Sequence, residues 1–427
     1  MKNKLSSLKI YAGLLTFLIL SYMSIPAWSQ TNEPVIIVRG KLVSEDTKRP
    51  VIFAHIYIAN TNIGTISNAE GSFILKVPES LKSSPIRISS MGYKTLSYKL
   101  GDLNATENMI TMVPEIINLQ EVIVRANDPI SLIRGAVKNV PENYGTSPYL
   151  CTAFYRESVM QNKQYVGVAE AVLNIYKSRY SNEMEMDRIK VFKGRKSQDV
   201  KRMDTLVFKL QGGQYTAMLL DLAKKPESFM QDEYFNDYEY KPVSIVNLED
   251  RETYVIEFAQ KEEVQEPFYQ GRIYLDINTL AIKKVEFSLS PYGLQYADKY
   301  LIKKKPANMN VKTASAYYMA DYRDVNGRWT LNHVHYEVKF KVDKKRHWFS
   351  KIYTSTVDLA ITDKDTVNVT KFKMSESLKP NQIFADHVNE FYDEGFWGSY
   401  NIIKPEEPIE EAVERISKRM KKYQGTN

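Results

Sequence analysis

Three side chains able to bind a metal ion recur at alternate positions of one segment: His333, His335 and Glu337. Alternate residues of an extended strand point to the same face, about 6–7 Å apart per step, and imidazole and carboxylate groups are zinc ligands. Lys339 and Lys341 continue the same face, which favours an ordinary exposed polar surface over a metal site. A metal-dependent hydrolase built on this face is therefore an alternative rather than the leading hypothesis.

The other residues that could do chemistry are few. Cys151 is the only cysteine, so no intramolecular disulfide can form. It lies in YLCTAFYRE, a strand-like segment where a cysteine is more often a small buried apolar residue than a nucleophile. The five histidines are not accompanied by a G-x-S-x-G nucleophile elbow, and the sequence has no phosphate-binding glycine loop. We therefore predict no catalytic, cofactor-binding or metal-binding residue and expect the chain not to be an enzyme.

The first 29 residues have the composition of a signal peptide. Basic KNKLSSLK precedes an apolar run at 10–20, and Pro26 and Ala27-Trp28-Ser29 then precede the expected cleavage point. The apolar run is shorter than the roughly 20 residues of a membrane-spanning helix, so an uncleaved anchor is the weaker alternative. Cys151 lies too far along for lipid attachment at a new N-terminus. We expect an exported protein, in the periplasm or at the periplasmic face of an outer membrane.

Length and charge narrow the class of protein further. Cleavage at residue 29 would leave roughly 400 residues, enough for two or three domains. The net charge of +7 includes the signal-peptide lysines and is too small to indicate nucleic-acid binding. The 29 tyrosines suit β-strands, and the sequence as a whole predicts a mainly β protein.

Residues 35–125 predict a small β-sandwich of short strands separated by turns. Gly64 and Gly71 are expected at turn positions with positive φ. The order VRGKLVSEDTKRPVIFAHIYIANTNIGTISNAEGSFILKV, then IRISSMGYKT and INLQEVIVR, resembles the carboxypeptidase-like regulatory domain. That domain is a transthyretin-like sandwich, also found as an N-terminal extension of TonB-dependent receptors. Asn68 stands where the family has aspartate, and supports the same turn. The resemblance implies an accessory module that docks or spaces.

The family name raises one further test for a metal site. Metallocarboxypeptidases bind zinc through an H-x-x-E pair and a later histidine, and His387-Val388-Asn389-Glu390 has the spacing of the pair. No histidine follows His387, and a regulatory domain would follow a carboxypeptidase domain rather than precede it. We therefore interpret this match as coincidental.

A helix and then a long sheet are expected after the sandwich. Asp128 and Pro129 begin a bridging helix at 128–141, which Pro141 ends. Residues 150–375 alternate in the strand period, and Asn326-Gly327 is a hairpin turn. The strand after that turn places its apolar residues, Val334, Tyr336, Val338, Phe340 and Val342, on one face. We predict a curved antiparallel sheet covered on one side only.

The sheet region is similar to the hairpins of lipoprotein-carrier-like half-barrels, in the stretch ETYVIEFAQ to GRIYLDINTLAIKKVEFSLS. In such folds a curved sheet wraps a helix or an apolar ligand. Residues 213–225 would be the helix that plugs the sheet. The C-terminal segment 376–427 is expected to contain an amphipathic helix at 408–422, with Ile409, Val413, Ile416 and Met420 as its apolar stripe.

These features favour a non-enzymatic protein of the cell envelope, acting as an interaction scaffold or binding an apolar ligand. Its expected partner is an envelope protein or an apolar ligand rather than nucleic acid, and any membrane association would be through a partner. An accessory component of an outer-membrane receptor or transporter is a second hypothesis, beside the metal-dependent hydrolase.

Overall fold

The computed structural model describes the chain in segments: residues 33–104, 106–115, 128–182, 184–198, 213–241, 243–248, 251–302, 309–344, 350–380, 382–390, 396–406 and 409–414. The predicted signal peptide at 1–29 and the segment INLQEVIVR at 117–125 lie outside the described residues. Within the described residues, no helix is both long enough and apolar enough to cross a membrane.

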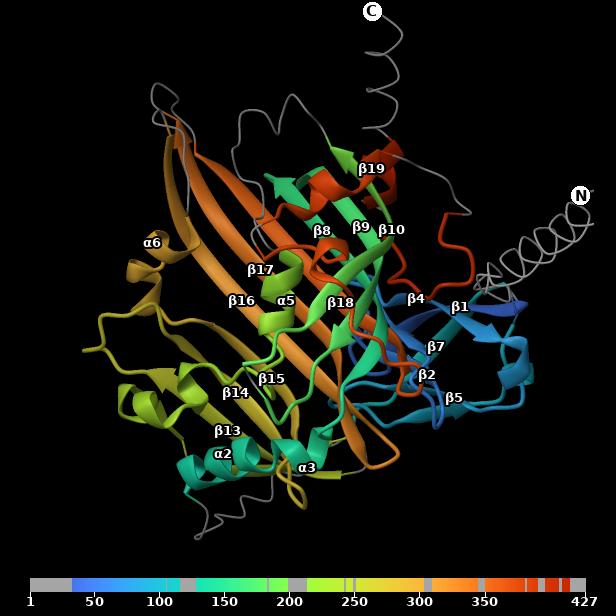
Figure 1. Ribbon diagram of the computed structural model, residues 1–427, viewed down its shortest axis with the longest axis horizontal. Helices are drawn as coiled ribbons and strands as arrows, with labels where there is room; N and C mark the ends of the chain where they lie inside the picture. The colour runs from blue at the N-terminus through green and yellow to red at the C-terminus, as the bar shows by residue number, and fades with distance from the viewer. Residues whose placement is uncertain are drawn as a thin grey trace, which may run out of the picture.

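The N-terminal part is a small β-sandwich, as the sequence predicted (Figure 1). One sheet has the order β4-β1-β7 and the other the order β3-β2-β5-β6. Leu42, Ile56 and Phe73 are fully buried between them. The strand bounds are β1 Val35–Ser44, β2 His55–Ile58, β3 Gly64–Ile66, β4 Ser72–Pro78, β5 Ile86–Ser89, β6 Leu96–Tyr98 and β7 Asn108–Met112, with short helices η1 Glu79–Leu81 and η2 Leu100–Asp102.

The turn before β4 is held by Asn68, whose Oδ1 accepts hydrogen bonds from the backbone N–H of Glu70 at 3.0 Å and of Ser72 at 2.8 Å. Gly71 in this turn has φ of +75°, as predicted. The prediction of positive φ for Gly64 was wrong, because Gly64 lies in strand β3. There a Cβ atom would approach the carbonyl oxygen of Ile56 to 2.9 Å, so glycine is favoured by close backbone packing.

The rest of the described strands form one large curved sheet, which confirms the predicted fold class (Figure 1). Its order is β11-β13-β14-β15-β16-β17-β18-β8-β9-β10-β19, with β12 also pairing with β13. All pairs are antiparallel except β10 with β19. The bounds are β8 Tyr149–Gln161, β9 Gln164–Lys177, β10 Arg188–Gln198, β11 Tyr238–Tyr240, β12 Ser244–Leu248, β13 Arg251–Gln260, β14 Tyr269–Asp276, β15 Ile282–Leu289, β16 Met309–Val325, β17 Arg328–Lys344, β18 Lys351–Asp365 and β19 Asn389–Glu390.

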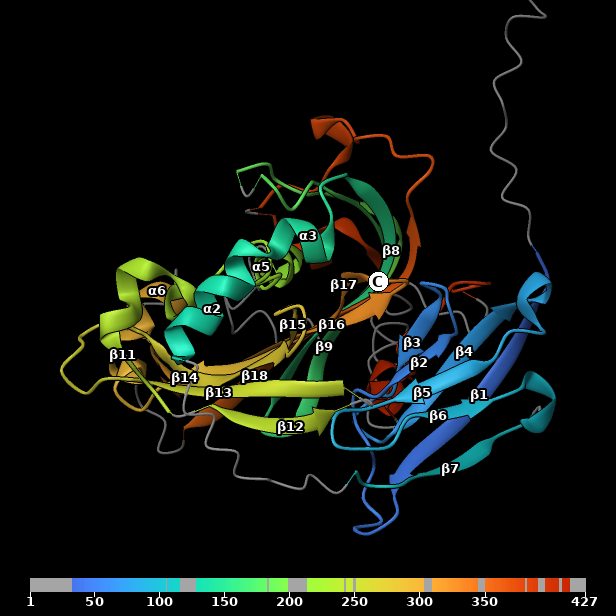
Figure 2. The ribbon, with the colours of Figure 1, turned by 90° about the horizontal axis from the view of Figure 1, so that it is seen from below.

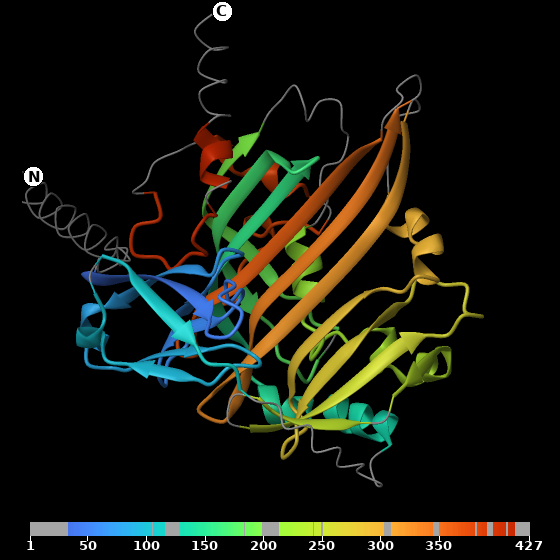
Figure 3. The same cartoon turned by 180° about the vertical axis from the view of Figure 1, so that it is seen from behind.

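The centre of this sheet is the long hairpin of β16 and β17, seen from behind in Figure 3. Asn326 and Gly327 have φ of +55° and +78°, as expected of the predicted two-residue turn. The apolar residues predicted to share a face of β17 are all buried in the main core: Val334, Tyr336, Val338, Phe340 and Val342. We call the face that they occupy the concave face, and the opposite one the convex face.

Helices α2 (Pro129–Lys138) and α3 (Val140–Tyr144) pack on the concave side (Figure 2). The Asp128 side chain caps α2 by accepting from Ile130 and Ser131 N–H groups, as its sequence indicates. Two details of the expectation were wrong. Pro141 lies in the first turn of α3 instead of ending the helical segment. Helix α2 buries Ile133 in the core of the large sheet, so it belongs to that domain and does not lie between the two domains.

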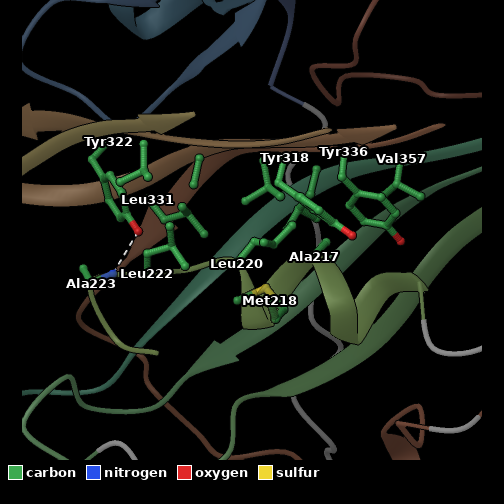
Figure 4. Close-up of a cluster of buried hydrophobic side chains, with 14 of the residues drawn as sticks. Ala217, Met218, Leu220, Leu222, Ala223, Tyr318, Tyr322, Leu331, Tyr336 and Val357 are labelled. Atoms are coloured by element: carbon green, nitrogen blue, oxygen red, sulfur yellow. Dashed lines mark hydrogen bonds between the residues drawn. The ribbon is translucent and has the colours of Figure 1, made fainter. Parts of the chain in front are cut away.

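Helix α5 (Gly213–Leu219) fills the concave face, although it ends well before residue 225. Ala217 and Met218 of α5, followed by Leu220 and Leu222, point toward the tyrosines of β16 and β17 (Figure 4). The backbone N–H of Ala223 donates a 3.1 Å hydrogen bond to the Tyr322 hydroxyl. The short helices η3 (Ser228–Met230) and η4 (Asp232–Asp237) continue this layer.

The remaining short helices are η5 Gly293–Tyr296, α6 Asp298–Leu301, η6 Met374–Glu376 and η7 Phe384–His387. Of the predicted C-terminal helix, residues 409–414 are helical, with Ile409 buried and Val413 half-buried. The residues at 408 and 415–422 lie outside the described part of the chain.

Buried charges fix the segment after α5. Lys177 lies 2.6 Å from Asp187 and 2.6 Å from Asp221, and all three side chains are less than 10% exposed. Tyr180 and Tyr322 donate to the Asp221 carboxylate at 2.7 and 2.9 Å. Burial opposes the charge of Lys177, but the two carboxylates outweigh it and raise the pKa of Lys177 above its usual value. The burial of each of these charged side chains is therefore favourable only while its partners stay in contact with it.

We predict that Asp221→Ala lowers the free energy of unfolding by about 3–5 kcal/mol, because it removes a partner from a buried lysine and from two buried hydroxyls. Urea denaturation measures the change. Asp232→Ala is the matched control: its carboxylate pairs with Arg134 at 2.7 Å but is 73% exposed, so an effect of about 0–1 kcal/mol is expected. Equal effects of the two substitutions would contradict this view of the core.

Candidate functional site

The sandwich docks directly on the convex face of the large sheet, opposite the helices (Figure 2). Ile66 of β3 packs in one buried cluster with Phe154 of β8, Val172 of β9 and Ala360 of β18. The prediction of a sheet covered on one side only was therefore wrong. A second layer covers part of the polar face, and that layer is the N-terminal domain of the same chain.

Residues 396–406, which we call the C-terminal strap, lie along this contact. The Thr65 hydroxyl donates to the carbonyl of Ile402 at 2.8 Å. The Asn401 side chain accepts from the backbone N–H of Lys76 at 2.7 Å and donates to its carbonyl at 3.2 Å, so it occupies part of the outer edge of β4. Arg156 of β8 donates to the carbonyl of Ile403 at 2.8 Å. The strap thus holds the sandwich to the sheet.

At the docking contact, one histidine of the sandwich meets a row of histidines and carboxylates on the large sheet. His55 of β2 lies 3.0 Å from Asp321 of β16. On the sheet, Asp358 of β18 accepts from His333 at 3.1 Å and from His335 at 2.8 Å. His333 Nδ1 lies 3.8 Å from the Asp321 carboxylate. This approach connects the His55–Asp321 pair with the contacts made by Asp358. We call these five residues the His–Asp chain.

Phe53 of the sandwich covers this chain. Its ring centroid lies 5.0 Å from that of His333 and 4.8 Å from that of His335. His333 is completely buried, and the side chains of Asp321 and Asp358 are 10% and 14% exposed. Because buried carboxylates are unfavourable unless paired, the contact of His55 with Asp321 and the cover provided by Phe53 favour the docked position of the sandwich.

The electrostatics of the His–Asp chain agree with this pairing. Burial opposes the charge on His333, but its interactions with Asp321 and Asp358 outweigh burial and raise the pKa of His333 to about 9. Burial also opposes ionisation of Asp321 and Asp358, yet the neighbouring histidines hold the pKa of each carboxyl well below its usual range. The site therefore favours a charged His333 in contact with two ionised carboxylates.

We predict that this contact makes stability depend on pH in a defined window. The raised pKa of His333 means that its contribution is full below about 6.5, the usual value for histidine, and is lost as pH rises through about 9. The lowered pKa values of the two carboxyls act in the opposite sense, since their contribution is present above about 3.9 and is lost in acid.

Thermal unfolding measured from pH 5 to 10 checks this dependence. His333→Gln should lower the melting temperature most at pH 5–6 and flatten the decline toward alkaline pH. His387→Gln, which alters an exposed histidine on η7, is the control. A decline of the same steepness in His333→Gln and in the unmutated chain would contradict the assignment.

The three candidate metal ligands of the alternative hypothesis do not form one set in the structure. His333 and His335 face Asp358, whereas Glu337 pairs with Lys339 at 2.8 Å. The interpretation of this face as exposed was thus wrong at its His333 end and right only toward Lys339. Among the residues described, no group of three or more histidines, cysteines, aspartates or glutamates is arranged to hold a metal ion.

Two other candidates can be placed. Cys151 is buried in β8, and burial, with a smaller opposing effect of the Lys177 charge, raises the pKa of its thiol to about 12. A thiol with that pKa is neutral at ordinary pH and is a poor nucleophile. His387 is exposed on η7, and the side chain of Glu390 is not described.

The sequence interpretation missed His55, Asp321 and Asp358 as members of a site. The pairing of Asp321 with His333 follows from the hairpin register, but a bulge at Asn332 shifts that register by one residue. Counting from the Asn326-Gly327 turn would have placed Asp321 opposite Asn332. His55 and its partner come from separate domains, and no local pattern signals that contact.

Beside the His–Asp chain lies an interdomain cleft of about 760 Å³. The sandwich contributes one wall through residues 50–55 and 90–93, and the strands β15 to β18 and β8 form the floor. Polar and apolar side chains alternate on this floor, among them Glu286, Tyr317, Met319, Glu337 and Ser158. In Figure 3 the sandwich lies beside the β16–β17 hairpin on this side of the sheet.

Comparison with known proteins supports the N-terminal assignment. Residues 38–124 match the model of the CarboxypepD_reg-like domain, as the resemblance in the sequence predicted. No curated protein matches the chain.

Two crystal structures show a distant similarity. A DUF1329 family protein from Desulfovibrio piger is 11% identical, with 59% of this chain and 100% of that protein aligned and a TM-score of 0.25. A LolA superfamily protein from Nitrosomonas europaea is 10% identical, with 58% of this chain and 99% of that protein aligned and a TM-score of 0.19.

Proposed function

We propose that the protein is a non-enzymatic binding protein of the cell envelope, and that it holds its partner in the interdomain cleft. The observation that carries this proposal is the cleft itself, about 760 Å³ in volume and walled by both domains. Ligand sites are commonly concave and lie at domain interfaces. The sandwich thus serves as a fixed wall of the site, in keeping with an accessory module.

The chemistry of the cleft favours binding over catalysis. The titratable groups on its floor are engaged with one another: Asp321 with His55, Asp358 with His335, and Glu337 with Lys339. Such pairs fix side-chain positions and present a stable polar surface. A nucleophile activated by a neighbouring base is not part of this arrangement as the described residues form it.

The apolar-ligand version of the hypothesis has less support. In lipoprotein-carrier-like half-barrels the ligand would lie on the concave face, and here α5 and Leu220–Ala223 occupy that face (Figure 4). A partner that binds the convex face, in contrast, contacts a polar surface. We therefore propose that the binding site lies on the convex side. We also propose that the protein is exported and acts in the periplasm or at the periplasmic face of the outer membrane.

Site-specific photocrosslinking tests this proposal. A photoreactive phenylalanine analogue at Tyr317, which is 38% exposed on the floor of the cleft, should give a defined adduct in cells that make the protein natively. The same analogue at Tyr300, 52% exposed on α6, is the control.

The expected result is an adduct of discrete mass at Tyr317 at least several times more abundant than any adduct at Tyr300. Adducts at both positions in equal yield, or at neither, would count against the cleft as a binding site. Both variants keep an aromatic ring, so differences in folding should be small, and thermal unfolding verifies that they are.

A further inference from the structure

The interdomain cleft continues into a second hollow on the convex face. This hollow has a volume of about 580 Å³ and shares Glu286 and Tyr317 with the cleft. Its floor is formed by strands β11, β13, β14, β15 and β16. The two hollows together make one groove that crosses the sheet from β13 to β8, about 30 Å at the usual spacing between strands.

The direction of this groove limits what can bind in it. It runs across the strands, and the strands from β13 to β8 are paired on both sides along the sheet order. Their backbone groups are therefore engaged, and an extended peptide has no free strand edge to join there. Recognition in the groove must come from side chains and ring faces.

Most of the charges in the groove are paired with one another. Glu257 accepts from Lys241 at 2.6 Å and from Arg272 at 2.9 Å. Glu286 lies 2.8 Å from Lys284, and Glu337 lies 2.8 Å from Lys339. A charged ligand would have to compete with these contacts, whereas a neutral ligand rich in hydroxyl groups can use the remaining lone pairs and N–H groups without separating the ions.

An aromatic ring lies where the two hollows join. Tyr317 is exposed on the floor, next to Met319 and within 6.1 Å of the His335 ring, centroid to centroid. The hydroxyls of Ser158, Thr356 and Ser288 line the same floor. Ring faces provide apolar contact surface, and hydroxyl and carboxylate groups provide directional hydrogen bonds. A sugar ring has both an apolar C–H face and equatorial hydroxyls, and matches this combination.

From this groove we infer that the ligand class is an uncharged oligosaccharide or polysaccharide chain, bound across the strands of the convex face with a sugar ring stacked on Tyr317. The inference rests on the proposed binding role and adds the chemistry of the ligand. Neutrality of the ligand follows from the paired ions, and its elongated shape follows from the continuity of the two hollows.

Affinity electrophoresis of the full mature chain tests the inference. Native gels containing a neutral β-glucan, a neutral xylan, an anionic alginate or a cationic chitosan are compared with a gel that contains no polymer. We expect one or both neutral polymers to retard the protein, with little change on raising the salt concentration, because no net charge is neutralised.

Tyr317→Ala should weaken the retardation by roughly tenfold in apparent affinity, the loss of one buried aromatic contact. Tyr300→Ala, which removes an exposed ring of α6 outside the groove, should leave it unchanged. Retardation by the charged polymers alone, no retardation by any polymer, or equal effects of the two substitutions would overturn the inference.

The two proposals fail in distinguishable ways. An adduct at Tyr317 in cells, combined with no retardation by neutral polymers, would contradict a saccharide as the ligand. It would still support the cleft as a binding site for another partner. If neither an adduct at Tyr317 nor retardation by neutral polymers is found, the proposal that the cleft is a binding site is contradicted as well.

Discussion

The docking of the sandwich on the large sheet depends on a charged contact that forms only when the two domains meet, in which His55 lies 3.0 Å from Asp321. Asp321 and Asp358 lie on the sheet, and His55 comes from the sandwich. Isolated in a low-dielectric contact, each carboxylate would be strongly unfavourable. The pairing of Asp321 with His55, and the packing of Phe53 on His333 and His335, favour one relative position of the domains over others. The relative position of the two domains in turn determines where the interdomain cleft lies.

Because the sandwich occupies the convex face, the two faces of the sheet have different roles. The concave face is filled by α5 and the segment anchored through Asp221, which makes it the core of the larger domain. The convex face keeps its polar side chains and gains a wall where the sandwich stands. The cleft of this protein therefore lies on the convex side of the sheet.

Two of the buried ionic clusters among the described residues differ in what they hold together. The one around Lys177 lies within a single domain and holds a loop against the sheet. The His–Asp chain spans both domains and includes titratable imidazoles. The pKa of Lys177 is raised above its usual value by its carboxylate partners, so Lys177 stays charged at ordinary pH. The interdomain cluster responds to pH through His333, whose pKa is raised to about 9.

The sequence alone determined the elements whose signals are local. Strand alternation identified the buried face of β17, Asn326-Gly327 identified the central hairpin, and Asp128 identified the start of α2. The turn chemistry of residues 61–73 carried the resemblance to the regulatory domain. These features depend on residues a few positions apart, so periodicity and turn preferences were sufficient to predict them.

Only the tertiary structure decided which polar face is covered and where a ligand can lie. His333 has the same sequence pattern as an exposed strand residue, and its burial results from a domain that is almost 300 residues earlier in the chain. The bulge at Asn332 changes which residue faces Asp321, and a pattern of alternation does not reveal such a shift. Contacts between separate domains depend on shape and charge complementarity across the whole surface, which no short segment encodes.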